Sequence, residues 1–250
     1  MSTPNDKSAA RPHDRPFDKP DASPAQIHPR LAGILYVVYF LSALPLALRT
    51  SMIRLSDPAA TAAHILASEQ LYRATIVSDL ASYAAYIALT VLLARIGALV
   101  SRSWAIVAAL LSLAGCVVLI AATALLTVPL ARPPSPQLST LALRLYAQGY
   151  NESLLLFGAF CAIMGALFFA GRLLPRLLGL FLAVAGFAWM ALSAANIVVP
   201  VLGSALAPSV LPFGAAAELA LGVWLLIRGV NLQHMASRHF ARRADGAGPV

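Results

Sequence analysis

Apolar residues fill six long windows of the chain, and short polar or basic segments separate them. Each window has about the length that an α-helix needs to cross the roughly 30 Å hydrocarbon core of a bilayer. The pattern therefore predicts an all-α fold, a polytopic transmembrane helical bundle with six spans. The windows are residues 31–48, 74–94, 104–128, 153–171, 177–199 and 210–227.

Composition supports the same fold class. The chain is 60% hydrophobic and 11% charged, whereas a soluble domain is about 45–50% apolar and about 25% charged. The net charge is +8, but the basic residues lie between the apolar windows and form no basic patch with interleaved aromatic residues. We therefore expect no nucleic-acid partner. The expected partner is the lipid bilayer, and the expected location is the inner (plasma) membrane of the cell, as a multi-pass protein.

The chain divides into three parts. Residues 1–29 carry six prolines among charged residues and no apolar periodicity, which predicts a disordered cytoplasmic tail. Residues 30–232 hold the predicted transmembrane bundle, and residues 233–250 form a basic cytoplasmic tail. No apolar run precedes Leu31, so we expect the first run to be an uncleaved span and not a signal peptide.

The distribution of basic residues favours one orientation. If the N-terminal tail is cytoplasmic, 13 of the 18 lysines and arginines lie on the cytoplasmic side and 5 on the outer side. Such a bias is typical of cytoplasmic loops. With six spans, both termini are then cytoplasmic. The five basic residues on the outer side are Arg49, Arg54, Arg73, Arg132 and Arg144.

Two outer segments are expected to be amphipathic helices. Residues 56–73 open with a serine and Asp57 followed by a proline, which is a helix N-cap with proline in the first turn. Glu69 and Arg73 form an i,i+4 pair of opposite charge. Residues 137–152 show a similar alternation. Either these segments lie along the membrane surface, or the second and fourth spans project beyond the bilayer.

The few polar residues of the windows gather in the outer half of the bilayer. A charge at the centre of a span costs about 2.5–3.5 kcal/mol on insertion scales. Asp79 lies about 8 Å from the outer end of the second span, and Glu218 lies about 12 Å inside the sixth. We expect an outward-facing polar cavity. Its candidate residues are Arg73, Asp79, Tyr83, Glu152, Asn196 and Glu218.

Helical periodicity predicts which side of its helix each of several polar and small residues occupies. A polar stripe follows one side of the second span, and it should face other helices or water and not lipid. Glu218 has glycines at i−4 and i+4, which predicts close packing on a neighbouring helix. Pro45 predicts a kink in the first span. The stripe consists of Thr75, Asp79, Ser82, Tyr83, Tyr86 and Thr90, and a small-residue face on the fourth span consists of Gly158, Ala162, Ala166 and Ala170.

Each acidic residue has a functional and a structural interpretation. Asp79 either serves a ligand, or anchors a network with tyrosine and serine or pairs with Arg73. Glu218 either serves a ligand or bonds to a backbone carbonyl, and Glu152 is interpreted as a solvated helix start. No metal, phosphate or nucleophile motif occurs. We therefore expect no catalytic residue, no metal and no cofactor.

Several stretches resemble one known family. They are RLAGILYVVYFLSAL, AATAAHILASEQLYRATIVSDLAS, AQGYNESLLLFGAFCAIMGALFFAGRLLPRLLGLFLAVAG and LPFGAAAELALGVWLLIRGVN. They lie within about residues 30–232, and the chain resembles the domain of unknown function 4386, an integral membrane family found mainly in bacteria. The resemblance implies a multi-span membrane protein without a known reaction. It also implies that Arg73, Asp79 and Glu218 are positions where family members are similar to this chain.

Three functions fit the sequence. In a small transporter or permeability protein, Asp79 and Glu218 would bind a proton or cation, the partner would be a small ion or solute, and Arg73 would favour the charged form of Asp79 or meet an anionic group. In a non-catalytic scaffold, the partner would be a membrane protein or a second copy of the chain. An intramembrane enzyme acting on a lipid or quinone would need Asp79 and Glu218 close together. Of these three functions, we favour the two that are not enzymatic.

Overall fold

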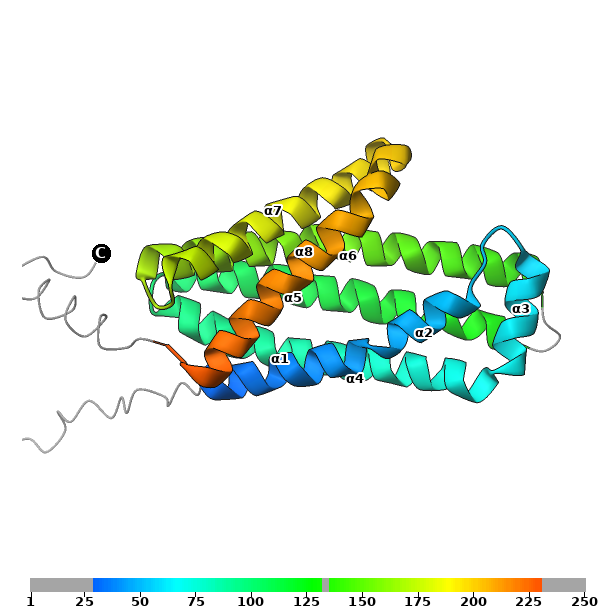
Figure 1. Ribbon diagram of the computed structural model, residues 1–250, viewed down its shortest axis with the longest axis horizontal. Coiled ribbons are helices and arrows are strands. Elements are labelled where there is room, and N and C mark those ends of the chain that lie inside the picture. Colours follow the sequence, from blue (N-terminus) through cyan, green and yellow to red (C-terminus); the bar gives the residue numbers. More distant parts are fainter. Residues whose placement is uncertain (1–28, 132–134, 231–250) are drawn as a thin grey trace, which may run out of the picture.

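Eight α-helices and one 3₁₀ helix form the described part of the chain, residues 29–131 and 135–230 of a computed structural model (Figure 1). Six helical segments are long and apolar enough to cross a membrane, when α1 is joined with α2 and α5 with η1. The predicted all-α bundle of six spans is confirmed. The tails predicted at 1–29 and 233–250 lie outside the described residues, apart from Pro29. In chain order the elements are α1 (Pro29–Ala43), α2 (Pro45–Met52), α3 (Pro58–Ala67), α4 (Glu69–Ala98), α5 (Arg102–Thr123), η1 (Ala124–Leu130), α6 (Pro136–Gly171), α7 (Arg176–Val198) and α8 (Pro200–Ile227).

The first span consists of two helices. Proline has no N–H for the preceding turn and its ring crowds the carbonyl four residues before it. Accordingly α1 ends at Ala43 and α2 begins at Pro45, which confirms the predicted kink. The helical segment then continues to Met52, beyond the predicted edge at residue 48. This extension brings Arg49 into the bundle, although the sequence pattern had placed it in an outer linker.

The two predicted amphipathic segments are helical, and they differ in how they join the spans. α3 is a separate helix, and the Asp57 carboxylate accepts a hydrogen bond of 2.9 Å from the Ala60 N–H, as expected for an N-cap. α6 is one continuous helix of 36 residues, about 54 Å long at 1.5 Å per residue. Figure 1 shows it along the bundle axis. Since a hydrocarbon core is about 30 Å thick, α6 projects beyond it.

The bundle has two different ends. α3 lies at one, here called the α3 end, and Pro29 and the last residues of α8 lie at the other, the terminal end (Figure 1). The connections α4–α5 and α6–α7 also lie at the terminal end (Figure 1), and the four arginines in or beside them, Arg95, Arg102, Arg172 and Arg176, are among the 13 basic residues assigned to the cytoplasmic side. A cytoplasmic terminal end stays a prediction.

Small residues hold α6 against α7. A Cβ at Gly165 of α6 would stand 2.5 Å from the Ala183 nitrogen and 2.6 Å from the Gly179 oxygen, both on α7. The predicted face was wrong in one respect: Ala166 and Ala170 are exposed, and Gly165 is buried. At 3.6 residues per turn, seven residues return closer to the same side of a helix than eight do. Gly158 therefore shares its contact face with Gly165 and not with Ala166.

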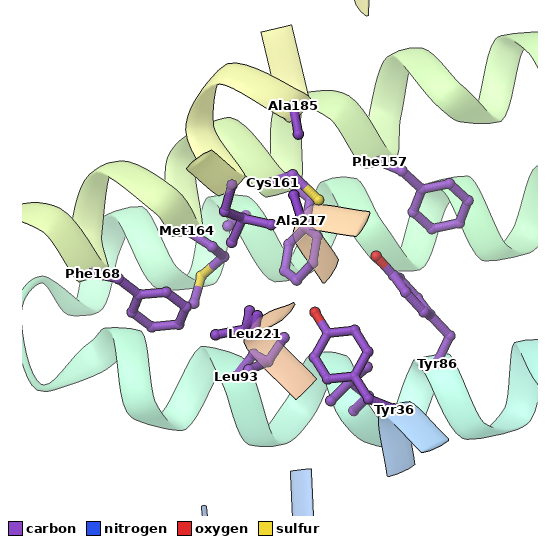
Figure 2. Packing of buried hydrophobic residues seen from close by; sticks show 14 of the residues in the cluster. Tyr36, Tyr86, Leu93, Phe157, Cys161, Met164, Phe168, Ala185, Ala217 and Leu221 are labelled. Carbon is purple, nitrogen blue, oxygen red and sulfur yellow. The ribbon is translucent and has the colours of Figure 1, made fainter. Parts of the chain in front are cut away.

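A core of apolar and aromatic side chains joins the spans, and part of it is drawn in Figure 2. Tyr86 of α4 packs edge-on against Phe157 of α6, with ring centroids 5.1 Å apart. Tyr36 of α1 is also fully buried. Figure 2 shows the hydroxyl groups of Tyr36 and Tyr86 pointing into the core, where Cys161 of α6 lies. The core thus holds hydrogen-bonding groups among its apolar side chains.

The α6–α7 contact predicts a large effect of adding one methyl group. We expect Gly165→Ala to lower stability by about 1–3 kcal/mol, the usual range for overpacking, because the new Cβ meets backbone atoms that cannot rotate away. Gly97→Ala is the matched control, since its nearest contact would be the flexible Met164 side-chain end at 2.9 Å. Thermal unfolding of both variants in detergent tests this. Equal melting temperatures would contradict it.

Candidate functional site

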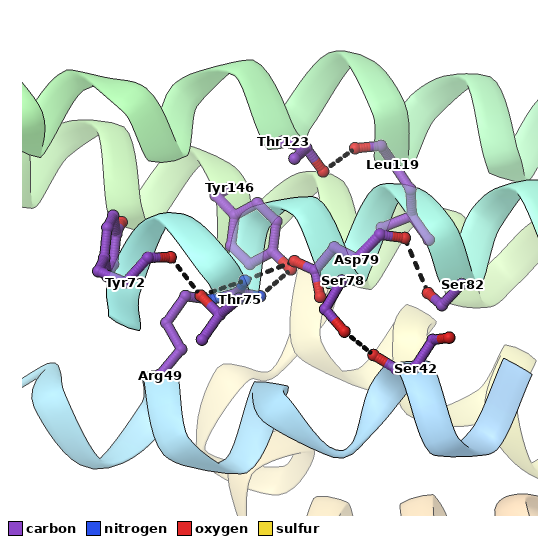
Figure 3. Close-up of polar contacts among 10 residues, drawn as sticks. All are labelled: Ser42, Arg49, Tyr72, Thr75, Ser78, Asp79, Ser82, Leu119, Thr123 and Tyr146. Carbon is purple, nitrogen blue, oxygen red and sulfur yellow. Dashed lines mark hydrogen bonds and ion pairs between the residues drawn. The ribbon is translucent and has the colours of Figure 1, made fainter. Parts of the chain in front are cut away.

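A buried ion pair joins the first span to the second. The Arg49 Nη1 of α2 lies 2.5 Å from the Asp79 Oδ2 of α4, and both side chains are buried. Arg49 Nη2 donates a hydrogen bond of 2.8 Å to the Tyr146 hydroxyl of α6, and Nη1 lies 3.4 Å from the Thr75 hydroxyl. Figure 3 shows these groups converging from three helices. The guanidinium also lies near the Tyr146 ring, with Cζ 5.1 Å from its centroid.

The polar side chains around this buried pair have hydrogen-bond partners of their own. Removing two charges from water is offset only when they are close to each other and their remaining hydrogen-bonding groups have partners. Thr75 and Ser82 donate to backbone oxygens of α4, and Ser78 donates to the Ser42 oxygen of α1 at 2.7 Å. Every residue of the predicted polar stripe is buried. The prediction that the stripe faces other helices is therefore confirmed.

Arg73 lies elsewhere. Its side chain is 57% exposed and pairs with Glu69 one turn away, at 2.8 Å between Nη2 and Oε1. The predicted i,i+4 pair is confirmed, and the cation beside Asp79 is Arg49. Sequence reasoning missed Arg49 because the apolar window ends at Leu48. The sequence did contain a feature that could have predicted this pairing. Arg49 and Asp79 belong to consecutive spans and lie near the linker that joins them, so they are at the same end of a helical hairpin.

Glu218 lies in a second buried polar group. Its Oε1 accepts a hydrogen bond of 2.6 Å from the Tyr86 hydroxyl, and the Cys161 Sγ lies 3.7 Å from the same oxygen. The side chain is 1% exposed. Within residues 29–131 and 135–230, Glu218 has no ion-pair partner. Its carboxyl therefore depends on neutral donors, unlike that of Asp79.

The glycines beside Glu218 allow close packing, as predicted, but their neighbours are side chains and not a backbone. A Cβ at Gly222 would lie 2.7 Å from the Tyr36 Cβ of α1. At Gly214 it would overlap the Trp189 ring of α7. Two aromatic side chains thus hold α8 on either side of Glu218.

One cavity of about 770 Å³ reaches both carboxyl groups. Tyr83 also lines it, so three of the candidate residues share this space. Asp79 and Tyr86 are seven residues apart on α4, about 10 Å along the helix axis and on one face. Since Tyr86 holds Glu218, the two carboxyls occupy separate positions, each with its own donors. This geometry does not make them a two-carboxylate acid–base pair.

The other two candidate residues lie outside this lining. Glu152 is exposed and accepts a hydrogen bond of 3.1 Å from the Gln148 side chain. Asn196 of α7 donates to the Asn151 side chain of α6 at 2.8 Å, and the Ser193 hydroxyl donates to the Asn151 backbone oxygen at 2.8 Å. These contacts form a separate polar cluster between α6 and α7.

The described residues contain no group of three or more His, Cys, Asp or Glu side chains able to hold a metal ion. Cys116 and Cys161 are free and buried. The cavity offers apolar surface and hydrogen-bonding groups, with Asp79 and Glu218 at two points on its wall.

Comparison with known proteins gives one match. Residues 31–229 match the family described as Domain of unknown function (DUF4386). No curated protein matches the chain, and no solved structure does.

The buried pair predicts that a single substitution lowers stability much more than the matching double substitution does. We expect Arg49→Met to lower stability by about 3–5 kcal/mol, because it leaves the Asp79 carboxylate buried without its cation. Arg49→Met combined with Asp79→Leu should regain most of this loss, since both charges are then removed. Unfolding in mixed micelles with increasing SDS measures both.

The matched control is Arg73→Met, which breaks the exposed pair with Glu69. Such surface pairs contribute about 0–1 kcal/mol. If the double variant were no more stable than Arg49→Met alone, the pair would not be what makes the single change harmful.

Proposed function

The chain belongs to the family described as Domain of unknown function (DUF4386), and from this premise of a multi-pass membrane protein we propose that it is a small transporter or permeability protein. Its binding site is the cavity between the spans. The observation that carries the proposal is a single cavity with two carboxyl groups on its wall, lined by side chains from α1, α2, α4, α5, α6, α7 and α8. A static scaffold does not need such a space within its core.

The two carboxyl groups have different roles in this proposal. Asp79 forms an ion pair with Arg49, so Asp79 acts as the structural counter-ion of Arg49. Glu218 has only neutral donors near it among the described residues, Tyr86 and Cys161. A carboxyl inside a span without a cation is the kind of group that takes up and releases a proton or binds a cation during transport. Glu218 is therefore the residue proposed to respond to protons or cations.

The scaffold alternative has less support. It was based on small-residue faces suited to helix association. Gly165 of α6 and Gly179 of α7 pack against each other within the chain, so this face is already occupied. The alternative of an enzyme with paired carboxylates is disfavoured by the separate donors of Asp79 and Glu218.

Proton flux tests the proposal. Wild-type protein reconstituted into liposomes with an internal pH dye should dissipate an imposed proton gradient faster than protein-free liposomes. Glu218→Gln should reduce this flux to the protein-free level, because the amide does not exchange a proton. Asp79→Asn should reduce it in part, since it leaves Arg49 without its counter-ion.

The matched control is Glu152→Gln, which makes the same change at an exposed carboxyl outside the cavity. Its flux should equal that of the wild type. Equal flux in all four proteins, or none in any of them, would refute the proposed function.

A further inference from the structure

The cavity reaches the surface of the bundle between α2 and α8. Several of its lining residues are also exposed on the outside of the protein: Leu44 is 66% exposed, and Ala47 and Pro212 are exposed as well. Leu211 and Ala215 of α8 are half-buried beside them. These five residues, here called the mouth, are all apolar. One opening of the cavity is therefore framed by apolar side chains of two spans.

The mouth exists because α1 and α8 meet closely at one end only. Near the terminal end, a Cβ at Gly33 would lie 2.5 Å from the Leu226 nitrogen, so the two backbones touch. Farther along, the helix breaks at Leu44 and α2 continues toward α4. α8 runs across the bundle toward the α7–α8 turn, away from α2 (Figure 1). The two spans therefore diverge beyond the Gly33–Leu226 and Tyr36–Gly222 contacts.

Helix lengths limit how far the mouth lies from the terminal end of the bundle. Leu44 is fifteen residues from the start of α1, and Pro212 is fifteen residues from the end of α8. Each distance is about 22 Å along its own helix, which is an upper limit for the height of the residue above the terminal end. A hydrocarbon core is about 30 Å thick. Since the height of the mouth is less than this thickness, an apolar opening there is suited to face lipid chains.

The interior combines apolar surface with hydrogen-bonding groups. Eight aromatic side chains line it, and about 770 Å³ falls within the usual range of about 300–1,000 Å³ for small-molecule pockets. Two of these aromatic residues are Tyr39 and Tyr150, whose hydroxyls make no hydrogen bond with the described part of the chain. A hydroxyl in an apolar space gains stability from an acceptor supplied by a ligand. The aromatic lining residues are Tyr39, Phe40, Tyr83, Tyr86, Tyr146, Tyr150, Phe157 and Trp189.

We propose that the ligand is an apolar molecule dissolved in the bilayer, carrying a hydrogen-bond acceptor such as a carbonyl oxygen, and that it enters the cavity sideways through the mouth. Its apolar part contacts the aromatic walls, and its acceptor takes a hydrogen bond from Tyr39 or Tyr150. This proposal deepens the proposed function by naming the class of solute. Binding in the cavity does not depend on the proposed function; only transport of the bound molecule rests on it.

Fluorescence quenching of Trp189 tests the binding step. The chain has three tryptophans, so Trp104→Phe with Trp224→Phe leaves Trp189, which lines the cavity, as the only one. The full chain is reconstituted into liposomes and titrated with the methyl ester of a dibrominated fatty acid. We expect saturable quenching. A dibrominated alkane of equal length should need an about fivefold higher concentration, since it offers no acceptor for the hydroxyls.

Two sets of variants separate this result from quenching by surrounding lipid. Ala47→Phe narrows the mouth and should raise the half-quenching concentration about tenfold, which corresponds to about 1.4 kcal/mol. Ala88→Phe makes the same change at an exposed position of α4 outside the lining and should have no effect. Ala215→Phe narrows the mouth from α8 and replaces Ala47→Phe if that variant does not fold. Tyr39→Phe with Tyr150→Phe should remove the preference for the ester.

Quenching that rises linearly with probe and is the same in the mouth variants would overturn the proposal. Saturable quenching that keeps its preference for the ester without either hydroxyl would overturn the assignment of Tyr39 and Tyr150. The measurement is made at equilibrium and needs no transport. Saturable quenching without proton flux would therefore refute the transport function but support the binding site. Proton flux without saturable quenching would refute the binding site but support the transport function.

Discussion

The ion pair between Arg49 and Asp79 determines how the polar interior of this protein is arranged. Two buried charges are tolerated only where each offsets the other and further donors and acceptors surround them. Arg49 also donates to Tyr146, so the pair connects α2, α4 and α6 at one level of the bundle. The break before Pro45 lets α2 follow α4 while α1 stays against α8. The same break that brings Arg49 to its partner therefore separates α2 from α8.

Tyr86 connects the two polar groups of the cavity. It stands two turns from Asp79 on the same face of α4, and its hydroxyl holds Glu218 of α8. One group is an ion pair with its charges matched, and the other is a carboxyl with neutral donors. A matched pair resists change, because removing either charge leaves the other exposed to a low dielectric. A carboxyl without a cation has no such restraint, and this difference underlies the separate roles proposed for Asp79 and Glu218.

Hydropathy and periodicity were sufficient to predict the six spans and the buried polar face of α4, because both depend on local sequence. The polar stripe of α4 is buried, and the kink at Pro45 is present. The partner of Asp79 was not predicted, because Arg49 lies 30 positions away in the chain and the window rule ended the first span before it. Glu218 posed the same difficulty, since its donor Tyr86 is on a helix 132 positions away. Such contacts depend on which helices become neighbours, and a single apolar pattern does not contain that information.

The separations of these two contacts along the chain have a consequence for biosynthesis. Arg49 and Asp79 belong to consecutive spans, so both members of the pair are present once the first two spans have been synthesised. Each charge alone would raise the free energy of inserting its span by about 2.5–3.5 kcal/mol at the bilayer centre. The Tyr86–Glu218 hydrogen bond joins the second span to the last. It forms only after synthesis of the whole bundle, so the wall of the cavity is completed by the final span to insert.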